Sequence, residues 1–209
     1  MYLIRVELDV RKKQTQLGLV SRNKFHGAIE DAYSLHDDKT KRKLWRIDKV
    51  GGNTYLLLMS EELPDLSEFV RQFGKESSEY EIKKYDALLD RVANHSVWQF
   101  RLVANPTRCV KQSNGRGKRV AHTSPKYQVE WLKKQGEKNG FHLLADNLQI
   151  RDVTWLHFNK KAERMIHALA VTYEGLLEVD DADKFREVLT SGLGREKAYG
   201  MGLLTIMGR

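Results

Sequence analysis

Residues 43–60 decide the fold, and they read KLWRIDKVGGNTYLLLMS. Two runs suited to β-strands, Lys43 to Asp48 and Thr54 to Ser60, lie on either side of Gly51-Gly52-Asn53. Adjacent glycines before an asparagine supply the positive φ angles of a tight turn, so this segment predicts a β-hairpin. The sequence on each side of the hairpin indicates which elements accompany it.

Helical spacing occurs both before and after this hairpin. Apolar residues between Phe25 and Ala32 recur at i, i+3, i+4 and i+7, with Ser21 as a candidate N-cap. Residues 65–68 have the pattern of a capping box and open a second helix. Strands are expected over residues 2–8, where apolar and polar residues alternate, and over residues 80–85. The order β-α-β-β-α-β is that of a ferredoxin-like unit.

The second half of the chain repeats this order. Its expected elements are a long strand over 97–110, a helix that opens at Ser124-Pro125, a hairpin over 152–159 and 164–173, a helix over 181–191 and a strand over 203–207. We therefore predict an α+β fold of two tandem ferredoxin-like (βαββαβ, RRM-like) domains. The first spans residues 1–88 and the second residues 96–209.

Positive charge is concentrated in one segment. The 209 residues carry 36 Lys and Arg against 28 Asp and Glu, a net charge of +8. No acidic residue occurs between Asp90 and Glu130, where eight basic residues supply the whole excess. Such a local field suits a polyanion, although a solvated loop is the simpler alternative. Residues 113–119, with two glycines and no apolar residue, predict a flexible basic tip between strands.

The C-terminal segment 192–204 is rich in glycine. It holds four glycines and two basic residues: Gly192, Gly194, Arg195, Lys197, Gly200 and Gly202. Glycine lets a backbone approach a phosphate closely while basic side chains neutralise it, so a phosphate-binding loop is one expectation and a plain turn the other. Because Lys197 is not followed by Ser or Thr, the segment is not a nucleotide-binding P-loop.

These features together resemble one known family. The glycine-rich tail, the segment Phe100 to Pro106, residues 117–121, Trp131-Leu132 and the early His26 occur in the family's order. On these motifs the sequence is identified as a member of the CasE-type endoribonucleases of type I-E CRISPR systems, from Met1 to Met207. The resemblance implies that precursor CRISPR RNA is cut at the base of each repeat hairpin. It also implies that the product, mature crRNA, stays with other subunits of the Cascade surveillance complex.

The resemblance places the family's catalytic histidine at His26, in the first turn of its helix beside Arg22 and Lys24. RNA cleavage without metal uses the substrate's 2′-hydroxyl, and it leaves a 2′,3′-cyclic phosphate and a 5′-hydroxyl. Such a reaction needs a base, an acid and positive charge on the phosphate. Family members often carry tyrosine three residues before the histidine, where this chain has Asn23. Asn23, Lys24 and Lys160 are candidate helpers of His26.

The expected RNA-binding residues combine the basic segment, the glycine-rich tail and a lysine pair in the second hairpin. They are Arg22, Arg108, Lys111, Arg116, Lys118, Arg119, Lys160, Lys161, Gly192, Gly194, Arg195, Lys197, Gly200 and Gly202. His122 is a further candidate contact. Because no histidines form an HxH or HExxH pair, no metal or other cofactor is expected. The four tryptophans are expected in the core, and His157 and His167 are expected to be hydrogen-bonded structural residues.

Two other functional classes remain open. A non-catalytic or slow RNA-hairpin-binding subunit is favoured by Asn23, whereas a metabolite-sensing tandem domain would leave the acid-free segment unexplained. Residues 1–8 carry charges at alternate positions instead of an unbroken apolar signal segment, and no apolar run is long enough to span a membrane. The single Cys109 allows no internal disulfide. We therefore expect a cytoplasmic protein that does not bind a membrane.

Overall fold

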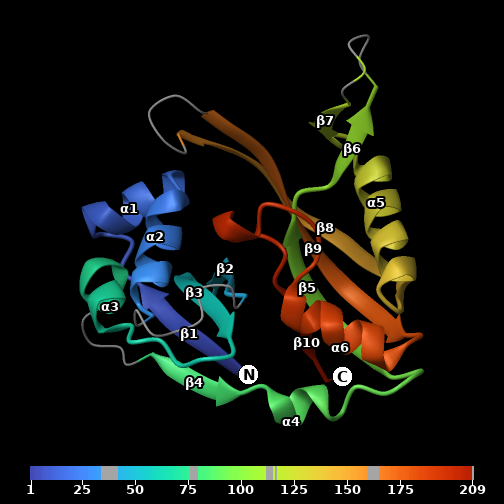
Figure 1. The fold of residues 1–209 in the computed structure, drawn as a ribbon, viewed down its shortest axis with the longest axis horizontal. Coiled ribbons are helices and arrows are strands. Elements are labelled where there is room, and N and C mark those ends of the chain that lie inside the picture. Colours follow the sequence, from blue (N-terminus) through green and yellow to red (C-terminus); the bar gives the residue numbers. More distant parts are fainter. Residues whose placement is uncertain (34–41, 76–79, 112–114, 116, 160–164, 209) are drawn as a thin grey trace.

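Two four-stranded antiparallel sheets organise the computed structural model, which describes residues 1–33, 42–75, 80–111, 115, 117–159 and 165–208 (Figure 1). The first sheet has the order β2-β3-β1-β4, with β1 (Tyr2–Leu8), β2 (Leu44–Val50), β3 (Asn53–Ser60) and β4 (Glu81–Lys84). The second has the order β10-β5-β9-β8, with β5 (Val97–Ala104), β8 (Phe141–Asn159), β9 (Met165–Val179) and β10 (Leu204–Met207). Each order is that of a βαββαβ unit, so the predicted fold class is confirmed.

The first unit packs its helices on one face of its sheet. These helices are α1 (Lys13–Val20), α2 (Asn23–Asp31) and α3 (Ser67–Phe73). Phe25 of α2 lies at the centre of the core, with its ring centroid 5.0 Å from Phe73 and 6.0 Å from Trp45. Alternation in β1 buries Ile4 and Val6 against these rings. Phe25 and Ile29 therefore fix the rotation of α2, and with it the direction of His26.

The second unit adds two projections to the same plan. Its helices α5 (Pro125–Lys138) and α6 (Ala182–Ser191) cover the sheet, while β6 (Thr107–Val110) and β7 (Lys118–Ala121) form a separate two-stranded hairpin. The long strands β8 and β9 arch beyond the sheet towards α1, which contacts β8 (Figure 1). A short 3-10 turn, η1 (Lys197–Tyr199), lies between α6 and β10. The linker from β4 to β5 holds α4 (Asp86–Leu89), and we propose 1–88 and 96–209 as the limits of the two domains.

Several local predictions were wrong. The strand predicted over 97–110 is two strands, because the chain leaves the second sheet at Asn105-Pro106. Ser21 does not cap α2: its hydroxyl donates to the side chain of Asn23, and Arg22 is the N-cap. The capping box at residues 65–68 does not form, since the Glu68 carboxylate accepts hydrogen bonds from two side chains of its own helix instead.

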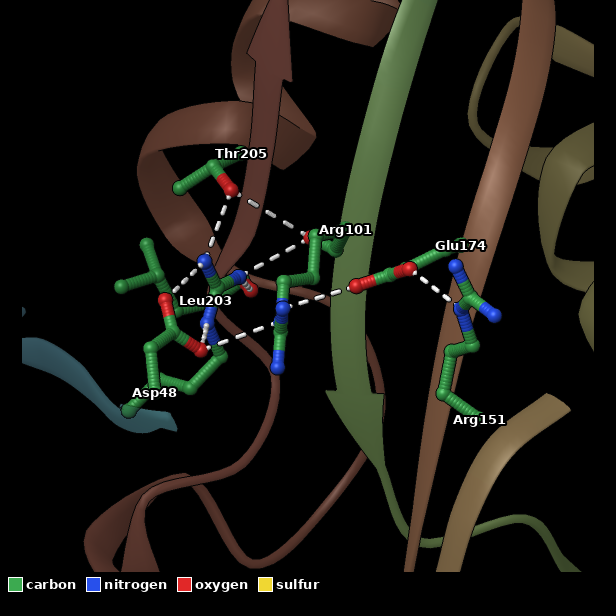
Figure 2. A network of polar contacts seen from close by, with 7 residues as sticks. Asp48, Arg101, Arg151, Glu174, Leu203 and Thr205 are labelled. Carbon is green, nitrogen blue, oxygen red and sulfur yellow. Dashed lines mark hydrogen bonds and ion pairs between the residues drawn. The ribbon is translucent and has the colours of Figure 1, made fainter. Parts of the chain in front are cut away.

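The two sheets meet through an apolar cluster and a polar network. Leu44, Met59 and Tyr85 of the first half pack with Leu203 of the second. The buried Arg46 donates to the backbone carbonyl oxygens of Arg101 at 2.9 Å and of Leu203 at 3.0 Å. Figure 2 shows how the network continues as a chain of alternating charges. Its links join Arg46 to Asp48, Asp48 to Arg101, Arg101 to Glu174 and Glu174 to Arg151, over distances of 2.7–3.1 Å. This interface fixes β2 against the C-terminal strand.

Three further findings concern the tryptophans, two of the histidines and the helices that the sequence predicted. Trp45, Trp98 and Trp131 are buried as expected, but Trp155 of β8 is 45% exposed. His157 and His167 form the expected hydrogen bond, Nδ1 to Nδ1 at 2.8 Å, although both are exposed. Within the described ranges, no helix is both long and apolar enough to cross a membrane.

Candidate functional site

The glycine-rich segment forms the connection between α6 and β10, and it packs against the first domain. Its turn η1 contacts both α2 and β2, and in Figure 1 it is the red segment between the two halves. Gly192, Gly194, Gly200 and Gly202 all have positive φ, between +77° and +87°. A Cβ built on Gly192 would lie 2.6 Å from Cδ2 of Leu44, and one on Gly200 would lie 2.7 Å from Cζ3 of Trp45. Glycine is therefore required at these two positions for the domains to pack closely.

His26 lies on α2, the helix that this loop contacts. Its side chain is 38% exposed, and its Nδ1 lies 3.8 Å from Oε1 of Glu30, one turn along the helix. The other oxygen of Glu30 accepts a hydrogen bond from Nζ of Lys43 at 3.1 Å, and that ammonium also lies over the ring of Tyr33. His26 is thus half-accessible, next to a carboxylate that already has a cationic partner. An imidazole in this position can exchange a proton with a substrate.

The predicted helpers lie in different environments. Asn23 begins α2, and its Oδ1 accepts a hydrogen bond from the hydroxyl of Ser21 at 2.6 Å. Lys24 is exposed. Arg22 is partly buried at the start of the helix, one turn before His26. Lys160 and Lys161 lie outside the described residues, as does Arg116.

A cavity of about 510 Å³ lies between the β6–β7 hairpin, α5 and the glycine-rich loop. Predicted RNA-binding residues from two distant parts of the sequence line it together, Arg108 and Arg119 from the hairpin and Gly194 and Arg195 from the loop. A Cβ on Gly194 would lie 3.2 Å from the Trp131 ring, which also lines the cavity. The structure therefore gathers these cations around one concave surface suited to a polyanion.

His122 lines the same cavity. Its ring stacks on that of the exposed Tyr127, with centroids 5.8 Å apart. Partial burial and then the positive charge of Arg108 lower the pKa of His122 below its ordinary value, and Glu130 opposes this shift. The neutral imidazole is therefore favoured while the cavity is empty of anions.

Other predicted RNA-binding residues differ in their placement. Lys111 follows the last residue of β6 and Lys118 is the first residue of β7. Both are exposed, and neither lines the cavity. Lys197 is half-buried, and its ammonium donates to the carbonyl oxygen of Ser191 at 2.8 Å. Burial and the neighbouring Arg42 lower the pKa of Lys197. Gly200 and Gly202 are buried. Lys197 and these two glycines thus hold the loop in shape.

Sequence reasoning missed two cations of the cavity, Lys134 and Lys138, which lie one turn apart on α5. The helical period identifies the buried face of α5, from which Trp131 and Leu132 point inward. It does not indicate that the hairpin β6–β7 stands beside the polar face. Among the residues that the structure describes, no group of three or more His, Cys, Asp or Glu side chains is arranged to hold a metal ion.

Comparisons with known proteins match the whole chain. A family model described as CRISPR associated protein matches residues 1–207. The CRISPR-associated endoribonuclease Cse3 of Thermus thermophilus is 28% identical over 222 residues, which cover 99% of both proteins. A structure of Cse3 bound to a 19 nt RNA aligns with a TM-score of 0.83 and 26% identity, covering 99% of this chain and 100% of that one.

Two further solved structures align with this chain over nearly its full length. Thermus thermophilus Cse3 bound to an RNA representing a pre-cleavage complex aligns with a TM-score of 0.82 and 27% identity, over 99% of this chain and 98% of that chain. Cas6e from Escherichia coli shares the fold over the full length of both chains, with a TM-score of 0.71 at 18% identity. The resemblance predicted from the sequence motifs is therefore confirmed. With nearly every residue matched by the family model, this chain belongs to the CRISPR-associated protein family.

Proposed function

We propose that this protein is a metal-independent endoribonuclease that binds the repeat hairpin of precursor CRISPR RNA and cuts it at its base. We further propose that it acts in the cytoplasm and keeps the mature crRNA as a subunit of Cascade. The relatives support the class of reaction, since one is named an endoribonuclease and has been solved with RNA in a pre-cleavage complex. A surveillance complex also contains a chain of this fold.

One observation carries the proposal most directly. The glycine-rich loop contacts the helix of His26 through η1, and a few residues earlier it lines the basic cavity with Gly194 and Arg195. An RNA hairpin held in the cavity by Arg108, Arg119 and Arg195 would lie against the same loop that reaches α2. The glycine-rich loop thus connects the basic cavity, which would bind the RNA, to the helix that carries His26. The recognition that this surface offers is mainly of charge and shape.

The proposed reaction is an internal transesterification. A base takes the proton of the 2′-hydroxyl, the 2′-oxygen forms a bond to phosphorus, and the bond between phosphorus and the 5′-oxygen breaks. An acid then gives the 5′-oxygen a proton, which leaves a 2′,3′-cyclic phosphate and a 5′-hydroxyl. We assign one of the two proton transfers to His26, whose half-exposed ring can reach a substrate. Asn23, Lys24 and Lys160 remain the candidate helpers.

The alternative function is a non-catalytic or slow subunit that holds the RNA hairpin. It is favoured by Asn23, which occupies the place of the tyrosine found in many relatives. In that case the basic cavity would bind RNA as proposed, but the half-exposed His26 would have no role in turnover.

The deciding experiment measures cutting and holding separately. Single-turnover cleavage of the cognate repeat hairpin is followed in EDTA, and the affinity is measured with the same hairpin carrying a 2′-deoxy group at the cut. His26→Ala should slow cleavage by about 10²- to 10⁴-fold, since that is the contribution of a positioned acid or base, and should leave affinity nearly unchanged. His142→Ala is the control because His142 is a half-exposed histidine at the start of β8. Parental cleavage by His26→Ala would show that the histidine assignment is wrong, and an inactive parent would favour the alternative.

A further inference from the structure

Arg22 and His26 project from the same side of α2. Arg22 is the N-cap of the helix, and its carbonyl oxygen accepts a hydrogen bond from the backbone N–H of His26 at 3.1 Å. The backbone of Arg22 is already helical, with φ −57° and ψ −22°. Residues four apart on a helix lie on one face, so the side chains of Arg22 and His26 are neighbours. Arg22 lies towards the buried face of α2, whereas His26 is half-exposed. Any anion that reaches His26 also approaches Arg22.

The guanidinium of Arg22 has no partner for two of its nitrogens. Nε and Nη1 are both buried, and neither makes a hydrogen bond. Burial lowers the pKa of Arg22 to about 10, so the group is still charged at neutral pH. The buried Arg46 differs, because every nitrogen of its guanidinium donates to an oxygen. Two buried guanidinium nitrogens without an acceptor are costly, and a transient anionic partner would relieve that cost.

The surroundings of Arg22 favour an anion of high charge density. The carboxylate beside His26 on this helix is Glu30, which already pairs with Lys43. The first turn of α2 also presents the positive end of its helix dipole. A phosphodiester placed beside His26 would therefore meet the positive end of the helix, and the carboxylate next to it already has a cationic partner.

We propose that Arg22 binds the scissile phosphate of the RNA and stabilises the negative charge that grows on its non-bridging oxygens during cleavage. This assignment rests on the proposed endoribonuclease function and deepens it. It also explains how the chain works with Asn23 in the place of a tyrosine, because the residue one position earlier supplies a catalytic contact. The planar fork of an arginine guanidinium can donate to two phosphate oxygens at once, which suits Arg22 to this role.

The test compares four variants in the cleavage and binding assays described above. Arg22→Ala should lower the single-turnover rate by about 100-fold, as expected for the loss of one positioned donor to a developing oxyanion, while affinity for the 2′-deoxy hairpin falls less than about five-fold. Arg22→Lys keeps the charge without the fork and should lie between Arg22→Ala and the parent. Arg71→Ala removes an arginine that pairs with the exposed Glu68 of α3, and should cut at the parental rate. Free guanidinium at millimolar concentration should restore part of the activity of Arg22→Ala and none of that of His26→Ala.

Stability separates a catalytic role from a structural one. Arg22→Met removes the buried unpaired charge but keeps the bulk, so its Tm should equal or exceed that of the parent while its cleavage stays slow. Slow cleavage accompanied by a lower Tm in both Arg22→Ala and Arg22→Met, without guanidinium rescue, would overturn the proposal. Parental cleavage by Arg22→Ala would overturn it as well, and if His26→Ala is inactive in the same series the proposed function still stands. An inactive parent would instead remove the proposed function.

Discussion

The indole of Trp45 occupies the space that a side chain at residue 200 would need. A Cβ on Gly200 would lie 2.7 Å from Cζ3 of that ring, and Gly200 has a φ of +78°. Trp45 also packs edge-on against Phe25 of α2, with ring centroids 6.0 Å apart. A single tryptophan therefore contacts both the helix of His26 and the glycine-rich loop of the other domain.

Gly200→Ala should therefore destabilise the protein by about 2–4 kcal/mol, from the positive φ together with overpacking against Trp45. Urea unfolding measures this loss. Gly51→Ala is the matched control, because Gly51 also has a positive φ, +58°, but has open space around its Cβ position. It should lose only about 1 kcal/mol. Equal losses in the two variants would mean that the backbone angle alone matters and that the contact with Trp45 does not.

Arg46→Met tests the polar network between the domains. The substitution leaves the carbonyl oxygens of Arg101 and Leu203 without this donor, and leaves Asp48 paired with Arg101 alone. The free energy of unfolding should fall by about 3 kcal/mol, since one partner of a buried charged network is lost. Arg71→Met, which breaks an exposed ion pair with Glu68, should cost less than about 1 kcal/mol. Similar losses in both variants would argue against a special role for the buried network.

The sequence predicted those elements whose signals are local. The hairpin of residues 43–60 follows from two strand-like runs and the glycines of its turn, whose φ angles are +58° and +82°. The helix predicted over 181–191 begins as expected, because the Asp181 carboxylate accepts a hydrogen bond from the backbone N–H of Lys184. In contrast, the sequence did not predict α1. Its buried residues are Thr15 and Gly18, so the helix has no buried apolar stripe that periodicity would reveal. Its glycine makes room for the ring of Phe25, a contact that no periodicity encodes.

The candidate site was predicted less completely than the fold. The motif around His26 and the basic character of residues 108–119 are visible in the sequence. The contact of Trp45 with Gly200 depends on packing between residues 155 positions apart, so the sequence predicted a phosphate-binding loop or a plain turn and not a contact between the two domains. Likewise, the unpaired guanidinium of Arg22 is a property of burial, and residue spacing does not report burial.

The cavity predicts a position-specific salt effect on RNA binding. Replacing Arg108, Arg119 and Arg195 together by Ala should flatten the slope of log K against log[salt] by about 2 to 3, because each of the three phosphate contacts releases about 0.7 to 0.9 of a counterion. The control replaces Arg5, Arg11 and Arg71, whose partners are carboxylates outside the cavity, and changes the net charge equally. Equal flattening by both triple variants would show that only net charge matters. The measurement uses the uncut 2′-deoxy hairpin, so cleavage does not interfere.

The position of His122 predicts that lowering the pH weakens the stability of the free protein but strengthens its affinity for RNA. In the free protein its pKa lies below the ordinary value, because of partial burial and the charge of Arg108. The unfolded chain therefore takes up the proton first as pH falls below about 6.5, so the folded protein should lose stability there, and less so in His122→Gln. Phosphates in the cavity would favour the imidazolium, so RNA binding should be coupled to proton uptake.

The affinity for the 2′-deoxy hairpin should thus rise between pH 7.5 and 5.5 more steeply in the parent than in His122→Gln. His142→Gln serves as the control, because His142 lies at the start of β8 and pairs with Asp180. It should keep the parental pH dependence of binding. If the parent and His122→Gln bind with the same pH dependence, RNA phosphates do not reach His122. The basic surface would then have to lie further out on the β6–β7 hairpin, towards Lys111 and Lys118.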